Sequence, residues 1–336
     1  MKHRRMTCQT LVVALAGMVF LLGCSSESAA PARTKAAVQT PTPSPPAVSL
    51  DAGPAGPVLR IDAARAMQYT REIFALGPRF VGSPGQQKAA AYLRAKLKND
   101  NLEEDAFEQE TPAGKKPMRN LIAKFTGSRE GMIVLASHFD TNYPLRKTSY
   151  AGANDGASST ALLLAIADQL RGKKLEGFSI CLVFLDGEEA VEEWTDTDSL
   201  YGSRRLAARW EKDGTLRKIK ALLLADMIGD ADLNIDQEDR STPWLRALVL
   251  KAATSLGYQS HFFHRQIPID DDHMPFVRRG VPAIDLIDMD YGYGDSYHHT
   301  VEDTLDKLSP QSLQITGDVI LETIRLLNGN ASQLPQ

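Results

Sequence analysis

Ile180-Cys-Leu-Val-Phe-Leu-Asp-Gly-Glu-Glu-Ala190 is an apolar run, rich in β-branched and aromatic residues, that stops abruptly on three carboxylates. An apolar run without polar alternation is typical of a strand that is buried on both faces of an α/β sheet. Ligands of open α/β sheets bind beyond the carboxyl ends of the strands, and Gly187 lets the chain turn sharply there. Glu188 and Glu189 repel each other in a partly buried position, so they need a cation or a shared proton. A solvated acidic turn is the simpler alternative for two adjacent glutamates.

The rest of the chain alternates between helical and strand patterns. Short apolar runs predict strands at 120–125, 132–137, 221–226 and 281–287, and apolar residues at helical spacing predict helices at 61–76, 84–97, 156–170, 242–256, 275–279 and 309–327. This alternation predicts a single α/β domain with a twisted, mostly parallel (mixed) central sheet flanked by helices. We expect this domain to occupy residues 59–330.

The N-terminus has the pattern of an export signal. Met1-Lys-His-Arg-Arg5 is basic, and the apolar run that follows ends at Leu21-Leu-Gly-Cys24. The run is too short for a bilayer core, which predicts a signal peptide over residues 1–23. Leu-Leu-Gly-Cys resembles a bacterial lipobox, which implies cleavage before Cys24 and a lipid on its thiol. The resemblance implies a lipid-anchored protein of the bacterial cell envelope, and Ser25 after the cysteine favours the outer membrane. Simple secretion is the alternative.

Residues 24–58 are rich in Pro, Ala and Ser and cannot bury enough apolar surface to fold, so we expect a semi-extended tether.

The formal net charge of −4 argues against nucleic acid as a partner. Of the three cysteines, only Cys181 lies in the predicted domain, inside the apolar strand. We expect it to act as a small core residue.

Polar residues that could carry chemistry follow several of the predicted strands and turns. They are His138, Asp155, the pair Glu188-Glu189, Asp226 and the histidines of Tyr297-His-His-Thr300. One such ending is common in solvated turns, but several at the same edge of a sheet indicate a site. Carboxylates and imidazoles without a thiolate suit zinc or a similar divalent ion in a site with an open position.

The order of these motifs resembles the zinc aminopeptidase family M28. The motifs are His138-x-Asp140, Asn154-Asp155-Gly, Asp186-Gly-Glu-Glu189, Leu224-Ala-Asp226 and His299-Thr-x-x-Asp303-Thr. Within that superfamily the chain is more similar to glutaminyl-peptide cyclotransferases of the animal type. Three stretches carry that preference: Glu188 to Trp194 with Asp198-Ser-Leu-Tyr-Gly-Ser-Arg204, Asp226-x-Ile-Gly229, and Asp271-Asp-His-Met-Pro-Phe-Val-Arg-Arg-Gly-Val-Pro282.

The resemblance implies a role for each matching residue. Asp155, Glu189 and His299 would hold one zinc ion, and Glu188 would be the catalytic acid and base. Asp226 and Asp271 would form a hydrogen-bonded carboxylate pair beside Glu188 and would also be catalytic residues.

The resemblance also extends to the substrate pocket. Trp194 would form part of its wall, although an ordinary core or surface tryptophan would have the same sequence pattern. His298 departs from the animal enzymes, which usually have Trp before the ligand histidine, so it changes the expected shape of the pocket.

The expected substrates are peptide or protein N-termini, and three functions remain open. A cyclotransferase converts N-terminal glutamine to pyroglutamate with release of ammonia; zinc would polarise the γ-carbonyl and a carboxylate of raised pKa would move the proton. A two-zinc aminopeptidase would use His138 and Asp226 for a second ion, with Asp155 as the bridge. A silent envelope binding protein with this fold would have gaps among its ligands, and the sequence has none.

Overall fold

The computed structural model of the chain describes residues 58–335. The predicted signal peptide, the lipidation of Cys24 and nearly all of the predicted tether lie outside the described residues. Within residues 58–335, no helix is long and apolar enough to cross a membrane.

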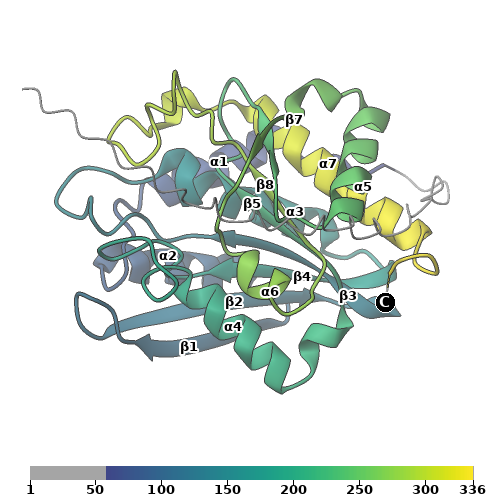
Figure 1. Cartoon of the computed structure of the whole chain (residues 1–336), viewed down its shortest axis with the longest axis horizontal. Coiled ribbons are helices and arrows are strands. Elements are labelled where there is room, and N and C mark those ends of the chain that lie inside the picture. Colours follow the sequence, from purple (N-terminus) through teal and green to yellow (C-terminus); the bar gives the residue numbers. More distant parts are fainter. Residues whose placement is uncertain (1–57, 336) are drawn as a thin grey trace, which may run out of the picture. The chain divides into compact units, whose positions relative to one another are not determined.

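A six-stranded mixed sheet forms the centre of the domain, with the strand order β1-β2-β4-β3-β5-β8 (Figure 1). The strands are β1 (Leu102–Gln109), β2 (Lys116–Phe125), β3 (Gly127–His138), β4 (Leu175–Leu185), β5 (Ile219–Asp226) and β8 (Ala283–Ile287). The last four strands of the order run parallel, while β2 pairs antiparallel with both of its neighbours. The predicted fold class is therefore confirmed. The carboxyl ends of the parallel strands meet at one edge of the sheet.

Three strands were not predicted. Edge strand β1 carries Glu103, Glu104 and Asp105, which hide the apolar alternation of a strand, although charged side chains are common on exposed sheet edges. The other two, β6 (Ile235–Glu238) and β7 (Phe262–Ile267), form a separate two-stranded parallel sheet.

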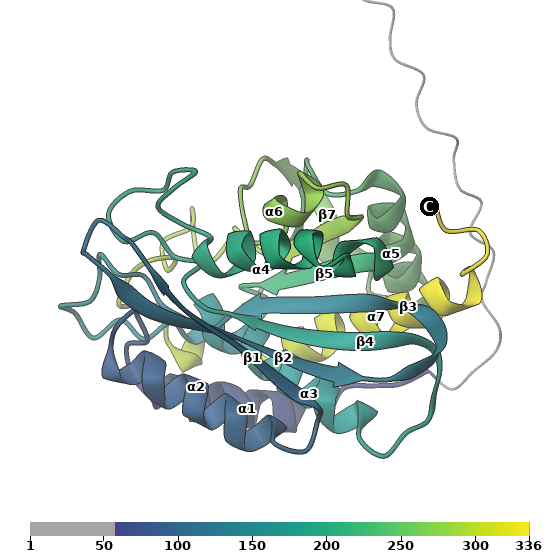
Figure 2. The same cartoon turned by 90° about the horizontal axis from the view of Figure 1, so that it is seen from below.

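Helices cover both faces of the central sheet (Figure 2). One face carries α1 (Ala63–Phe74), α2 (Pro84–Leu97), α3 (Ser159–Leu170) and α7 (Pro310–Gly329), and α5 (Pro243–Leu256) packs against α7. The other face carries α4 (Tyr201–Lys212) and the short α6 (Met274–Val277). Turns of 3-10 helix occur at Thr215–Lys218, Gln259–His261 and Leu305–Lys307.

β4 is buried on both faces, as its apolar run predicts. Ile180, Leu182 and Phe184 point into the core with α1, α3 and α7. Cys181 and Val183 point into the second core, under α4 and α6. Full burial of each large apolar side chain contributes about 1.5–3 kcal/mol. The two cores therefore hold the end of β4 rigidly in place.

The sequence also determines where two of the helices begin. Ser83 caps α2 by accepting a hydrogen bond from the backbone N–H of Gln86, with Pro84 at the first helical position. The predicted helix at 156–170 begins differently. Residues Ala153–Ser158 form a single wide turn before α3, because Asp155 (ψ 105°) and Gly156 (φ 81°) leave helical geometry. This break turns the carboxylate of Asp155 toward the carboxyl edge of the sheet.

Candidate metal centre and active site

The polar residues at the carboxyl edge of the sheet are placed directly by its strands. β3 ends on His138 and β5 on Asp226, and β4 is followed by Gly187, Glu188 and Glu189. Gly187 has φ 72°, and a Cβ atom there would lie 2.7 Å from the sulfur of Met118. The sharp turn predicted at this glycine is therefore present, in a backbone conformation that favours glycine.

The first donor set converges on His299. Its Nε2 atom lies 3.0 Å from Oε1 of Glu189 and 3.3 Å from Oδ2 of Asp155. Both carboxylates are buried, and His299 has a strained backbone with φ 50°. Asn142, which was not predicted, donates to the other oxygen of Glu189 at 3.0 Å. This arrangement aims one imidazole and two carboxylates at a common point.

A second donor set lies on the other side of Asp155. Nε2 of His138 is 3.1 Å from Oδ1 of Asp155 and 3.2 Å from Oδ1 of Asp226. The two oxygens of Asp155 therefore face different partners. Imidazoles and carboxylates without a thiolate are the donor types of zinc enzymes with an open coordination position. The residues present fit such an ion in the first set, and the second set has the same composition.

Glu188 lies beside these donors without joining them. Its backbone N–H and that of Glu189 donate to the carboxylate of Asp140 at 3.1 and 3.3 Å. Burial raises the pKa of Glu188 well above that of an ordinary glutamate; the charge of His138 opposes the shift, and the carboxylates of Glu189 and Asp271 add to it. A carboxyl group of raised pKa at the rim of a cation site can accept and return a proton near neutral pH.

Asp226 and Asp271 are brought together, but each has another partner. Asp226 accepts a hydrogen bond from His138, while one oxygen of Asp271 accepts the backbone N–H of Asp272 and its other oxygen has no hydrogen-bond partner within residues 58–335. Burial and the charge of Asp226 raise the pKa of Asp271 to about 6. Neither oxygen of Asp285 has a donor, although the side chain is fully buried. Burial without a donor raises the pKa of Asp285 well above its ordinary value, and the charge of Asp271 adds to the shift.

The loop that carries Asp155 is held by residues from both ends of the domain. Asp303 accepts the backbone N–H groups of Asn154 and Asp155 at 2.8 and 3.2 Å. The fully buried guanidinium of Arg79 donates to the backbone carbonyls of Phe139, Ala151 and Gly152. Asp303 stands in a motif that is visible in the sequence, but the sequence does not reveal these contacts.

A cavity of about 280 Å³ opens beside the donor sets. Its other lining side chains include Trp194, Met227, Ile269, Met289 and His298. Trp194 is 42% exposed, which is consistent with a wall that a substrate would cover. The ring of His298 lies against that of His299, with centroids 4.0 Å apart and planes tilted by 39°, and its Nδ1 atom lies 3.1 Å from Asp295. The structure thus places both predicted pocket residues at the cavity.

Arg278 pairs with two carboxylates near this cavity. It lies 3.6 Å from Asp196, two residues after Trp194, and 3.1 Å from Asp270, which lines the cavity. The loop of Trp194 is also stabilised by Asp198, which accepts three consecutive backbone N–H groups from Val191 to Glu193.

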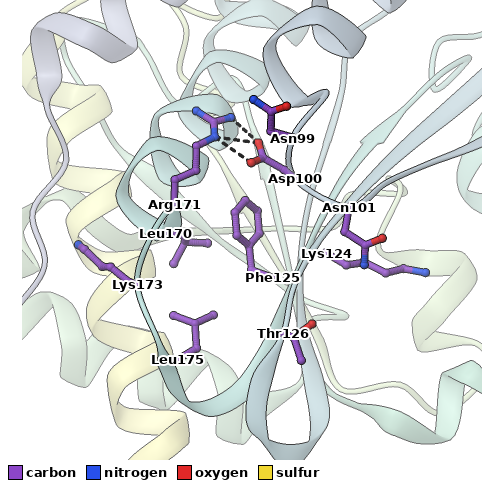
Figure 3. Close-up of a pocket in the computed structure, with 11 residues that line it drawn as sticks. Asn99, Asp100, Asn101, Lys124, Phe125, Thr126, Leu170, Arg171, Lys173 and Leu175 are labelled. Carbon is purple, nitrogen blue, oxygen red and sulfur yellow. Dashed lines mark hydrogen bonds and ion pairs between the residues drawn. The ribbon is translucent and has the colours of Figure 1, made fainter.

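A larger cavity, of about 420 Å³, lies beside the amino end of β4, roughly 33 Å from the catalytic edge at 3.3 Å per strand residue. It is lined by the ends of strands and a helix, with Phe125, Leu170 and Leu175 among its apolar residues. Figure 3 shows the guanidinium of Arg171 facing the carboxylate of Asp100, which it contacts at 2.9 Å.

Comparison with known proteins gives a consistent result. Residues 120–324 match peptidase family M28. The glutaminyl-peptide cyclotransferase of Drosophila melanogaster is 32% identical over 253 residues, covering 67% of this chain and 70% of that protein.

Solved structures extend the likeness. The glutaminyl cyclase of an Acidobacteriales bacterium is 50% identical, with a TM-score of 0.80 over 83% of this chain and 99% of the other. A Zn-dependent exopeptidase from Parabacteroides distasonis is 26% identical, with a TM-score of 0.72 over 80% of this chain and 99% of the other.

Proposed function

The chain belongs to peptidase family M28, and from this membership we infer that it cyclises the N-terminal glutamine of peptides to pyroglutamate, with release of ammonia. Its relatives at 32% and 50% identity carry the names of glutaminyl-peptide cyclotransferase and glutaminyl cyclase. The structural observation that carries the proposal is the convergence of Asp155, Glu189 and His299 next to a buried Glu188. That arrangement combines a cation site with a separate proton carrier.

We propose that Asp155, Glu189 and His299 hold one zinc ion. When bound, zinc supplies a positive charge that polarises the γ-carbonyl of the substrate. Replacing His299 by Ala removes one ligand, so zinc content measured by elemental analysis should fall well below that of the wild type. Full zinc content in that variant would show that another residue is the ligand.

Glu188 is the proposed acid and base. The α-amine nitrogen of the substrate attacks the carbon of its own side-chain amide, a new N–C bond forms, and the bond to the amide nitrogen breaks. Glu188 takes one proton from the amine and gives it to the departing nitrogen, so ammonia leaves and no water is consumed. The nucleophile is intramolecular, and the cavity walls mainly have to hold the glutamine in attack geometry.

Asp226 and Asp271 support this proton carrier in the proposal. Their negative charges, together with burial, favour a protonated carboxyl within the cluster at neutral pH.

The rival activity is hydrolysis of N-terminal residues by a two-metal site. His138, Asp155 and Asp226 lie close enough together to hold a second ion, and this is the observation that favours it. The relatives of highest identity described above are named as cyclases, and they favour cyclisation.

One assay separates the two activities. The purified protein is given a glutaminyl dipeptide amide and, separately, leucine p-nitroanilide, and zinc is counted in the same preparation. Ammonia release from the first substrate with about one zinc per chain supports the cyclase. Cleavage of the second with about two zinc ions would make the protein an aminopeptidase.

We also propose that the chain is exported and lipid-anchored through Cys24 to the bacterial cell envelope, in the outer membrane. The support is the lipobox-like sequence and the Pro-rich residues after it. Replacing Cys24 by Ser should release the protein from the membrane fraction, and continued membrane association of this variant would contradict the anchor.

A further inference from the structure

Tyr150 contacts two of the three proposed zinc ligands, and the sequence gives no sign of it. The residue is 2% exposed and lies just before the turn that carries Asp155. Its hydroxyl donates a short hydrogen bond to Oδ2 of Asp155. Its ring meets the ring of His299 edge-on, with centroids 6.4 Å apart and planes at 87°. One buried side chain therefore touches both a carboxylate and an imidazole of the site.

The hydrogen bond reaches one particular oxygen of Asp155. Oδ2 faces His299, whereas Oδ1 faces His138 and, through it, Asp226. Within residues 58–335, the side-chain contacts of Oδ2 are those with Tyr150 and His299, so the phenol favours the observed rotation of the carboxylate. The hydroxyl thus selects which oxygen is presented to the proposed zinc site.

A purely apolar role would not need the hydroxyl. Phenylalanine would fill the same space, and burying a phenolic O–H is favourable only when it finds an acceptor. Here the acceptor is a carboxylate that the proposal makes a metal ligand, and hydrogen bonds from surrounding residues to such ligands fix their orientation.

We propose that Tyr150 is a positioning residue for the metal, and that its hydroxyl raises zinc affinity by orienting Asp155 toward His299 and Glu189. The proposal rests on the proposed function, because it assumes zinc at these ligands. It adds a determinant of metal affinity that lies outside the ligand set.

The test compares Tyr150→Phe with Tyr69→Phe in the purified full-length chain. Tyr69 is a matched control, since it is also 2% exposed and its hydroxyl donates to a carboxylate, Asp168, at 2.8 Å in the helical layer. Zinc dissociation constants are measured by competition with a chromophoric chelator, and the melting temperature of each protein is recorded without and with zinc.

Tyr150→Phe should weaken zinc binding about 10- to 100-fold. Tyr69→Phe should leave it within about twofold, because its hydrogen bond touches no proposed ligand. The zinc-induced rise in melting temperature should shrink in Tyr150→Phe alone. Added zinc should restore much of its activity. A merely structural role would lower both melting temperatures and leave both zinc constants unchanged.

Two negative results have different meanings. If the wild type binds zinc and cyclises glutamine but Tyr150→Phe binds zinc equally well, the role of Tyr150 is wrong and the proposed function stands. If the wild type binds no zinc, both proposals are wrong. If Tyr150→Phe does not fold without zinc, the midpoint of its zinc-dependent folding gives the comparison, and a midpoint equal to that of the wild type overturns the proposal.

Discussion

The two ends of β4 differ in how their buried charges are paired. At the amino end, the buried carboxylate of Asp100 has a guanidinium partner in Arg171, and the cavity beside it is the larger of the two described above. At the carboxyl end, Glu188 and its neighbouring carboxylates outnumber the imidazoles, and no Lys or Arg lines the cavity. Charge that is buried without a matching cation, rather than cavity size, distinguishes the functional end.

Replacing Glu188 by Gln tests the carboxyl end of β4, with its excess of buried carboxylates, most directly. The amide cannot carry the proton, so kcat should fall about 10²- to 10⁴-fold, while zinc content and fold stay unchanged. Steady-state kinetics and elemental analysis on the same sample measure both. A fully active variant would contradict the proposed role of Glu188.

Replacing Asp271 by Asn should make the protein less active and, at high pH, more stable. The folded pKa of Asp271 is about 6, above the roughly 3.9 of an unfolded aspartate. Its stabilising contribution is therefore complete below about pH 3.9 and is lost as pH rises through 6. Asparagine does not titrate. The free energy of unfolding of the variant, measured relative to that of the wild type, should therefore rise by about 1–3 kcal/mol between pH 5 and pH 8.

Urea unfolding at pH 5 and pH 8 measures that difference. The replacement is close to isosteric, so a change in packing is not expected. An equal stability difference at the two pH values would show that Asp271 does not titrate in this range.

Replacing Arg171 by Met tests the amino end of β4, where the buried carboxylate has a cationic partner. It leaves the carboxylate of Asp100 buried without its cation, so the free energy of unfolding should fall by about 1–3 kcal/mol. Because this pair lies at the far end of β4, kcat/KM for glutaminyl substrates should stay within about twofold. A large loss of activity in folded Arg171→Met protein would mean that the two ends of the strand are coupled.

The smallest effect is expected for Arg278→Met. Its partner Asp196 is 83% exposed, and exposed ion pairs contribute at most about 1 kcal/mol. KM should rise about two- to threefold with kcat unchanged, and high salt should produce a similar rise in the wild type. Arg279→Met is the matched control, since Arg279 pairs with Glu211 instead of a cavity wall. Equal KM changes in the two variants would show that the ion pairs of Arg278 do not influence substrate binding.

The sequence predicts the elements whose pattern has a local cause. The double burial of β4, the turn at Gly187 and the start of α2 follow from nearest neighbours in the chain, and all three are present. Strand β1 was missed because its charges pair with other elements, for example Asp105 with Arg205 of α4. Its stability depends on contacts that a local pattern does not contain.

The candidate site shows the same division. Residue types and their order indicate the donors, since carboxylates and imidazoles after strands are recognisable motifs. The supporting residues Tyr150 and Asp285 were missed, because a tyrosine before a turn and one aspartate inside an apolar strand have no motif. Their roles arise from the rotation of side chains across the sheet edge, which only coordinates reveal.

The buried guanidinium of Arg79 has a practical consequence for protein engineering. A fragment beginning at β2 would keep every proposed ligand and Glu188. It would lack Arg79, however, and with it the hydrogen bonds to the carbonyls of Phe139, Ala151 and Gly152. The minimal active unit is therefore longer than the segment that contains the catalytic residues. Trimming, permutation or fusion designs should leave the chain intact from α1 onward.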